Sequence, residues 1–211
     1  EVVLPKNYPN IFNVDIASPA AFEEPIDAFV GNQLRKGIFP LWNPFISCGT
    51  VVQEQFSTRT LFPYQLLQNI CSWQWRDFFL LGRLFLAALG VFIFLQLRGI
   101  SFYPSLCGGA MYGLSGAMTV FLTLTQMSNV GMVLPYALIG SELLHLGISI
   151  YSVAFCSLAF ASVILGGQPE TALYCFLFVF AYHIFRVISD QKERHAIKNY
   201  IVFFVPIMLS L

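Results

Sequence analysis

A long apolar stretch fills the second half of this chain and limits what the chain can fold into. Between residues 78 and 187 the only acidic side chains are Glu142 and Glu170. Over the whole chain 57% of the residues are hydrophobic, 10% are charged, and the mean hydropathy is +0.70. A water-soluble domain needs more polar surface than this, because most of its exterior faces water. We therefore expect an all-α membrane protein, a polytopic bundle of transmembrane helices.

The apolar stretch divides into segments of about the 20 residues that cross a bilayer. We expect spans at 78–97, 105–125, 130–147, 148–166 and 171–188, and a sixth from 199 to the end. The last apolar run is too short to cross a bilayer, so we expect the sequence to be a fragment of a longer protein. The loop after the fifth span carries Lys192, Arg194 and Lys198. Basic residues collect in cytoplasmic loops, so residues 1–76 are expected outside the cytoplasm, followed by the membrane part, 77–211.

Two helices are predicted in the extracytoplasmic part. Apolar residues recur at helical spacing over 22–36, with acidic residues early, basic residues late and Gly37 just beyond. That polarity suits the helix dipole, and glycine favours helix termination. A second, shorter helix is expected over 63–75, where Trp73 and Trp75 indicate the membrane interface. Both helices either lie flat on the outer leaflet or pack on the bundle as ordinary amphipathic helices.

The chemistry of the chain is not that of a familiar soluble enzyme. The sequence has no Gly-rich phosphate loop, no GxSxG and no paired-His metal motif, and its zero net charge predicts no nucleic-acid partner. Carboxylates on the outer side could act as a general base or hold Mg²⁺ or Mn²⁺, with solvated surface charge as the alternative for each. These are Asp15, Glu23, Glu24, Asp27, Glu54, Asp77 and Glu170. We choose Asp15 as the candidate catalytic residue, because its loop precedes the amphipathic helix and could bend back over a membrane cavity.

A compact turn follows the first predicted helix. Two prolines and two glycines restrict the backbone between Gly37 and Gly49. Trp42 offers an aromatic face to a sugar or an isoprene, and Asn43 offers an amide to hydroxyls or phosphate. The alternative is a rigid structural corner, and the sequence does not separate the two.

Two side-chain pairs are expected elsewhere. Cys48 and Cys71 share the N-terminal segment and are a candidate disulfide in an oxidising compartment. Glu142 and His183 are expected at a similar depth in the membrane, where they could pair inside the bundle. We expect this pair to be a structural contact rather than a functional site.

Several segments together resemble the YfhO-like bacterial membrane proteins, within the GT-C class of glycosyltransferases that use polyprenyl-phosphate sugars. The resemblance covers about residues 20 to 190. It rests on Pro40-Leu41-Trp42-Asn43-Pro44-Phe45, Cys48-Gly49-Thr50, Leu61-Phe62-Pro63-Tyr64-Gln65-Leu66-Leu67, Asn129 with Leu134-Pro135-Tyr136, and Gly167-Gln168-Pro169-Glu170-Thr171-Ala172-Leu173-Tyr174.

The resemblance implies an enzyme of the bacterial cytoplasmic membrane that moves a sugar from a polyprenyl-phosphate carrier to an acceptor at the outer face. Asp15 matches the acid of the first outer loop by position, although the family places that acid in a Gly-Asp pair closer to the helix. Gln168 stands where a histidine is common. The candidate cations for the departing phosphate are Arg59, Arg76 and Arg83. The expected substrate-binding residues are Trp42, Asn43, Arg59, Asn129, Gln168 and Glu170.

Two other functions remain open. A transporter or flippase of a lipid-linked substrate predicts internal repeats and broken helices at mid-membrane. The sequence shows no repeat, and small residues at Gly109, Gly113 and Ala117 have the four-residue spacing of close helix packing. The other alternative is a membrane scaffold with the same fold and no catalytic site.

Overall fold

The protein is a bundle of helices with a layer of shorter elements at one end. The computed structural model describes residues 19–46, 48–54 and 58–189, so Asp15 and the sixth expected span lie outside the described residues. The elements in chain order are η1 (Pro19–Glu23), α1 (Glu24–Arg35), β1 (Trp42–Asn43), β2 (Thr50–Val51), η2 (Val52–Glu54), α2 (Pro63–Ile70), η4 (Trp73–Trp75), α3 (Arg76–Leu97), α4 (Phe102–Gly113), α5 (Gly116–Val120), α6 (Thr125–Leu146), α7 (Ile150–Leu165) and α8 (Pro169–Ser189).

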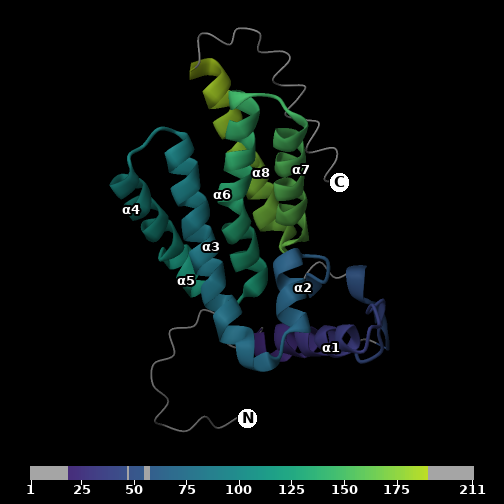
Figure 1. Cartoon of the computed structure of the whole chain (residues 1–211). Coiled ribbons are helices and arrows are strands. Elements are labelled where there is room, and N and C mark those ends of the chain that lie inside the picture. Colours follow the sequence, from purple (N-terminus) through teal and green to yellow (C-terminus); the bar gives the residue numbers. More distant parts are fainter. Residues whose placement is uncertain (1–18, 47, 55–57, 190–211) are drawn as a thin grey trace, which may run out of the picture.

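Helix α6 lies at the centre of the bundle. Helix α3 contacts α4 and α6, and α6 also contacts α7 and α8 (Figure 1). Val130, Ala137, Phe160 and Val179, from three of these helices, are all almost completely buried in the main core. The expected helical fold is confirmed. Helices α3, α6 and α8 all begin at the end that carries α1 and α2 (Figure 1).

Among the residues that the structure describes, two helices are long and apolar enough to cross a membrane. They are Trp73–Leu97, which includes α3, and Pro169–Ser189, which is α8. Helix α7 is apolar but has only 16 residues. Both long helices bury less than a third of their most apolar 18-residue window inside the protein, so most of that apolar surface needs another cover. This supports a membrane protein, and membrane crossing by the remaining helices stays a prediction.

The predicted span 105–125 is wrong, because the chain breaks there into α4 and α5. Helix α4 ends at Gly113, and Ser115 caps the new helix by accepting a hydrogen bond from the Met118 backbone N–H at 3.4 Å. The 12 residues of α4 rise by about 18 Å, which is less than the ~30 Å of a hydrocarbon core.

Close packing between α3 and α4 explains the spaced glycines. A Cβ added at Gly109 would lie 2.6 Å from the backbone oxygen of Ala88, and one at Gly113 would lie 2.8 Å from that of Leu84. Both distances are shorter than van der Waals contact, and both neighbours are backbone. The helix-packing interpretation of the small residues is confirmed at these two positions.

The N-terminal layer is built from α1, the short β1–β2 hairpin and α2. The predicted helix over 22–36 appears as η1 and α1, and the one over 63–75 as α2 followed by the turn η4. Gly37 follows α1 with a φ of 73°, and its N–H donates to the Leu34 carbonyl at 2.9 Å, so glycine ends this helix as expected. Helix α1 packs on α2, and Ile26, Val30 and Val52 form a small second core.

The candidate Glu142–His183 pair and the candidate disulfide differ from what the structure shows. The Glu142 carboxylate, at the far end of the bundle, accepts hydrogen bonds from Arg98 at 2.9 Å, from Arg186 at 2.9 Å and from the Tyr182 hydroxyl at 2.6 Å. Two guanidinium groups thus compensate its charge, while His183 Nδ1 lies 3.3 Å from the Ser141 hydroxyl. Cys48 and Cys71, the candidate disulfide, are both free thiols in the structure.

Candidate functional site

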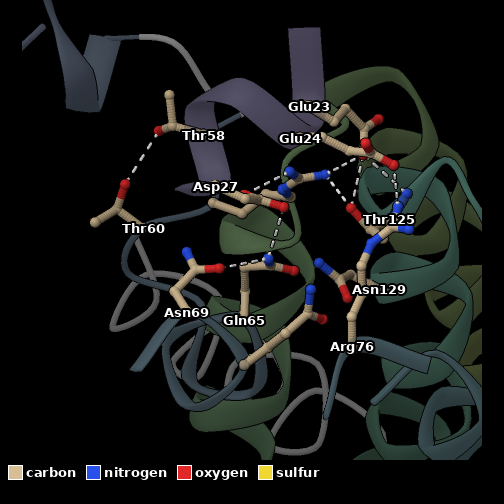
Figure 2. Close-up of polar contacts among 12 residues, drawn as sticks. Glu23, Glu24, Asp27, Thr58, Thr60, Gln65, Asn69, Arg76, Thr125 and Asn129 are labelled. Carbon is tan, nitrogen blue, oxygen red and sulfur yellow. Dashed lines mark hydrogen bonds and ion pairs between the residues drawn. The ribbon is translucent and has the colours of Figure 1, made fainter. Parts of the chain in front are cut away.

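A buried network of polar side chains joins the N-terminal layer to the bundle. Its centre is Arg59, which is 2% exposed and has a φ of 50°. Arg59 donates from Nη1 to Glu23 Oε2 at 2.7 Å and from Nη2 to Asp27 Oδ1 at 3.1 Å. Figure 2 shows Glu23 and Asp27, from η1 and α1, close to Thr125 at the start of α6. We call this network the junction cluster: Glu23, Asp27, Arg59, Gln65, Gln68, Arg83, Thr125 and Asn129.

Glu23 also caps a helix that lies 102 residues away in sequence. Its Oε2 accepts hydrogen bonds from the backbone N–H of Thr125 at 3.2 Å and from the Thr125 hydroxyl at 2.7 Å. Thr125 is the first residue of α6, and its hydroxyl accepts from Arg59. A carboxylate at a helix N-terminus binds unpaired N–H groups and is favoured by the helix dipole. Glu23 therefore fixes the N-terminal layer to the start of α6.

A second arginine in the cluster contacts neutral oxygen atoms. Arg83 is 0% exposed and donates to Asn129 Oδ1 at 2.7 Å, Gln65 Oε1 at 2.7 Å and Gln68 Oε1 at 2.8 Å. Gln65 in turn donates from Nε2 to Asp27 Oδ2 at 3.1 Å. The two arginines therefore belong to one continuous hydrogen-bond network.

Burial and neighbouring charges shift the pKa values of Asp27 and Arg59 in opposite directions. Loss of water raises the pKa of the Asp27 carboxyl, and the positive charge of Arg59 only partly opposes that effect. Burial lowers the pKa of Arg59, but its attraction to Asp27 and Glu23 outweighs burial and holds that pKa above its ordinary value. Arg59 thus stays charged.

A pocket of about 190 Å³ opens beside the junction cluster, between α1, α2 and the start of α3. We call it the α1–α2 pocket. It is lined by side chains of mixed chemistry, and Arg76 stacks on the Trp73 ring with 4.9 Å between the guanidinium carbon and the ring centroid. The polar and aromatic lining residues are Asp27, Arg35, Gln68, Asn69, Ser72, Trp73 and Arg76. A carboxylate, two cations, two amides and an indole ring therefore meet in one place.

Some of the residues chosen from the sequence come together at this end of the protein. Arg59 and Asn129 are both members of the junction cluster, and the Asn129 amide lies 3.5 Å from the Gly166 carbonyl that precedes α8. Gln168 is half-buried and Glu170 is exposed at the start of α8. Neither belongs to the cluster or lines the α1–α2 pocket.

The turn that contains Trp42 and Asn43 has a structural role. Asn43 is buried, and its Oδ1 accepts a hydrogen bond from the Phe45 backbone N–H at 3.0 Å. A Cβ at Gly49 would lie 2.2 Å from the Trp42 ring, so this glycine is needed for the ring to lie there. These contacts favour the rigid-corner interpretation, although the exposed face of Trp42 is open to a ligand.

Sequence reasoning named Glu23 and Asp27 among the outer carboxylates but chose Asp15 instead, and it overlooked Gln65, Gln68 and Thr125. One signal was available: the two acids are four residues apart, and this spacing puts both on one helix face. Glutamine residues at 65 and 68 likewise share a face of α2.

Comparisons of the chain with protein-family models, with curated proteins and with solved structures found no match. The expected metal ion finds no ligand set in the part of the chain that the structure describes, where no three His, Cys, Asp or Glu side chains lie together. Glu23 and Asp27 do not fit that role, because both direct oxygens at Arg59. We therefore derive no step through a metal.

Proposed function

We propose that the protein is a multi-pass enzyme of the bacterial cytoplasmic membrane that transfers a sugar from a polyprenyl-phosphate carrier at the outer face. The observation that carries the proposal is the position of the α1–α2 pocket. It opens where the polar N-terminal layer meets the first residues of the apolar helix α3. A lipid-linked donor needs such a place, because its sugar and phosphate are polar while its chain stays in the hydrocarbon.

The α1–α2 pocket offers the side-chain types that such a transfer requires. A carboxylate must take the proton of the acceptor hydroxyl, and within the described residues Asp27 is the carboxylate that lines the pocket. Its raised pKa makes it a stronger base than an ordinary carboxylate. The indole of Trp73 offers a face to a sugar ring, and the pocket's guanidinium groups oppose the charge of a departing phosphate. Asp15 stays the second candidate base.

The decisive experiment measures sugar transfer by the full-length protein in lipid nanodiscs, with radiolabelled polyprenyl-phosphate sugars as donors. We expect Asp27→Asn to lower the transfer rate by about 100-fold, which is the lower range for loss of a general base. Asp77→Asn is the matched control, because Asp77 is exposed and does not line the pocket, and its rate should stay within about twofold.

The unfolding temperature of each variant shows whether a lost rate reflects chemistry or misfolding. If Asp27→Asn is active, the same measurement on Asp15→Asn tests the other candidate base. A wild-type protein that transfers no sugar from any of these donors would end the proposal, and so would full activity in both variants.

A flippase for lipid-linked substrates is the second candidate, and one observation favours it. The chain breaks between α4 and α5, at Leu114 and Ser115, as expected for a discontinuous helix that lines a path for a polar group. Movement of a fluorescent polyprenyl-phosphate sugar across proteoliposome membranes, without sugar transfer, would favour this function. Inactivity in both assays would favour the scaffold.

A further inference from the structure

Two arginines from separate elements lie in the wall of the α1–α2 pocket with their positions fixed. Arg35, at the end of α1, donates from Nη1 to the Cys71 carbonyl at 3.0 Å and from Nη2 to Asn32 Oδ1 at 2.8 Å. Arg76, at the start of α3, pairs through Nη2 with Glu24 at 2.7 Å and stacks on Trp73. A guanidinium has five N–H groups, so these contacts leave donors on both side chains.

A buried amide with an unused donor belongs to the same pocket wall. Asn69 is 5% exposed, and its Oδ1 accepts from Gln65 Nε2 at 3.0 Å. Its Nδ2 is buried and has no hydrogen-bond partner among the described residues. Figure 2 shows this nitrogen on the side away from Gln65. An unsatisfied buried donor lowers stability, so a ligand oxygen that accepted a hydrogen bond from this nitrogen would be stabilised.

The charge of the pocket wall favours an anion. Arg35 and Arg76 carry positive charge, and Asp27 is the one carboxylate among the lining residues that the structure describes. Asp27 Oδ1 accepts from Arg59 and its Oδ2 from Gln65, so Arg59 balances the negative charge of Asp27. Glu24 shares the charge of Arg76, and the charge of Arg35 is left for a ligand.

The size and place of the pocket narrow the ligand further. A volume of about 190 Å³ is below the roughly 300–1,000 Å³ of pockets for drug-sized molecules, which suits one headgroup rather than a whole lipid. Trp73, Trp75 and Phe78 are each more than half exposed beside it, at the start of a helix apolar enough to cross the membrane. Exposed tryptophans mark the level of lipid headgroups.

We infer that the α1–α2 pocket binds a phosphate monoester, held by Arg35, Arg76 and the Asn69 amide. Guanidinium groups bind phosphate oxygens in pairs, and a monoester carries about 1.5 to 2 negative charges, which Arg35 and the remaining charge of Arg76 balance in part. The inference deepens the proposed function, on which its membrane setting rests, by naming the group that this pocket recognises. It concerns binding and needs no sugar transfer.

Calorimetry on the full chain in nanodiscs tests the inference with four probes. They are farnesyl phosphate, dihexanoyl phosphatidic acid, inorganic phosphate and, as the uncharged control, farnesol. We expect saturable binding of both lipid phosphates and none of farnesol. Arg35→Gln and Arg76→Gln should each weaken binding by about tenfold, the effect of losing one charge-assisted hydrogen bond at a partly exposed site. Arg76→Lys should recover part of the loss, because it restores the charge.

Lys36→Gln is the matched control. It removes the same charge from the neighbouring residue, which is exposed and does not line the pocket, so binding should change by less than about twofold. Equal binding of inorganic phosphate would identify free phosphate as the ligand, and tighter binding of the lipid phosphates would identify a lipid headgroup. Equal loss in Lys36→Gln, or no saturable binding of any phosphate probe, overturns the inference. Phosphate binding without sugar transfer would refute only the proposed function.

Discussion

Replacement of Arg59 by methionine tests whether the junction cluster holds the N-terminal layer to the bundle. Methionine has a similar length and no charge, so Glu23 and Asp27 would be left buried without their cation. At an effective dielectric constant of about 20, an ion pair at about 3 Å contributes about 5.5 kcal/mol. The two pairs, at 2.7 Å and 3.1 Å, therefore contribute about 11 kcal/mol before the cost of burying the charges.

Desolvation of the buried charges offsets a large part of that attraction. Removal of one partner from a buried ion pair typically lowers the free energy of unfolding by about 3–5 kcal/mol, and we expect Arg59→Met to fall in this range. The assay is reversible unfolding of the full chain in mixed micelles with increasing SDS. The variant with Glu23→Gln and Asp27→Asn added should recover more than half of the loss, because no unpaired charge then remains buried.

Two results would contradict this reasoning. One is an Arg59→Met protein within about 1 kcal/mol of the wild type, which would mean that water reaches the two carboxylates. The other is a triple variant that is less stable than Arg59→Met, because the cluster would then act through its hydrogen bonds and shape rather than through the balance of charge.

Two further predictions concern packing and pH. Gly109→Ala should lower the free energy of unfolding by about 1–3 kcal/mol, because the new methyl group would lie 2.6 Å from the Ala88 carbonyl oxygen, whereas Gly116→Ala, with nothing within 4 Å, should be neutral or slightly stabilising in the same micelle assay. The Asp27 carboxyl should titrate above its ordinary pKa of 3.8 in isotope-edited infrared spectra, and a midpoint below 3.8 would show that Arg59 outweighs burial. Because the pKa of Asp27 is raised in the folded protein, the stabilisation due to its protonated form is fully present below pH 3.8 and is lost as the pH rises through the raised pKa. The unfolding temperature of the wild type, compared with that of Asp27→Asn, should therefore fall as the pH rises.

The helices could be predicted from the sequence because burial in lipid or in a helical core requires long apolar runs. The predicted ranges 78–97 and 171–188 differ from α3 and α8 by at most two residues at each end. The break at Leu114 and Ser115 was missed, since hydropathy continues unchanged across it. Only the capping hydroxyl of Ser115 marks the start of the second helix, and serine is common inside apolar segments of this chain.

The junction cluster could not be predicted, because its contacts join residues far apart in the sequence. Arg59 lies 36 residues from Glu23 and 66 residues from Thr125, and no local periodicity connects them. Their positive charge made Arg59 and Arg83 candidates from the sequence. Their hydrogen-bond partners, however, depend on how the N-terminal layer packs against the bundle. The choice of Asp15 relied on its place in a loop, whereas the buried carboxylates of the structure lie on a helical face.

Truncation of the gene after Trp75 would not give two autonomous proteins. The amino-terminal product would expose Glu23, which now caps α6, and in the carboxy-terminal product Arg83 would lose the two glutamine side chains to which it donates. Each half thus supplies polar partners to the other. Because Glu23 binds the first residue of α6, a chain synthesised from its amino terminus completes this contact only after residue 125 has been made.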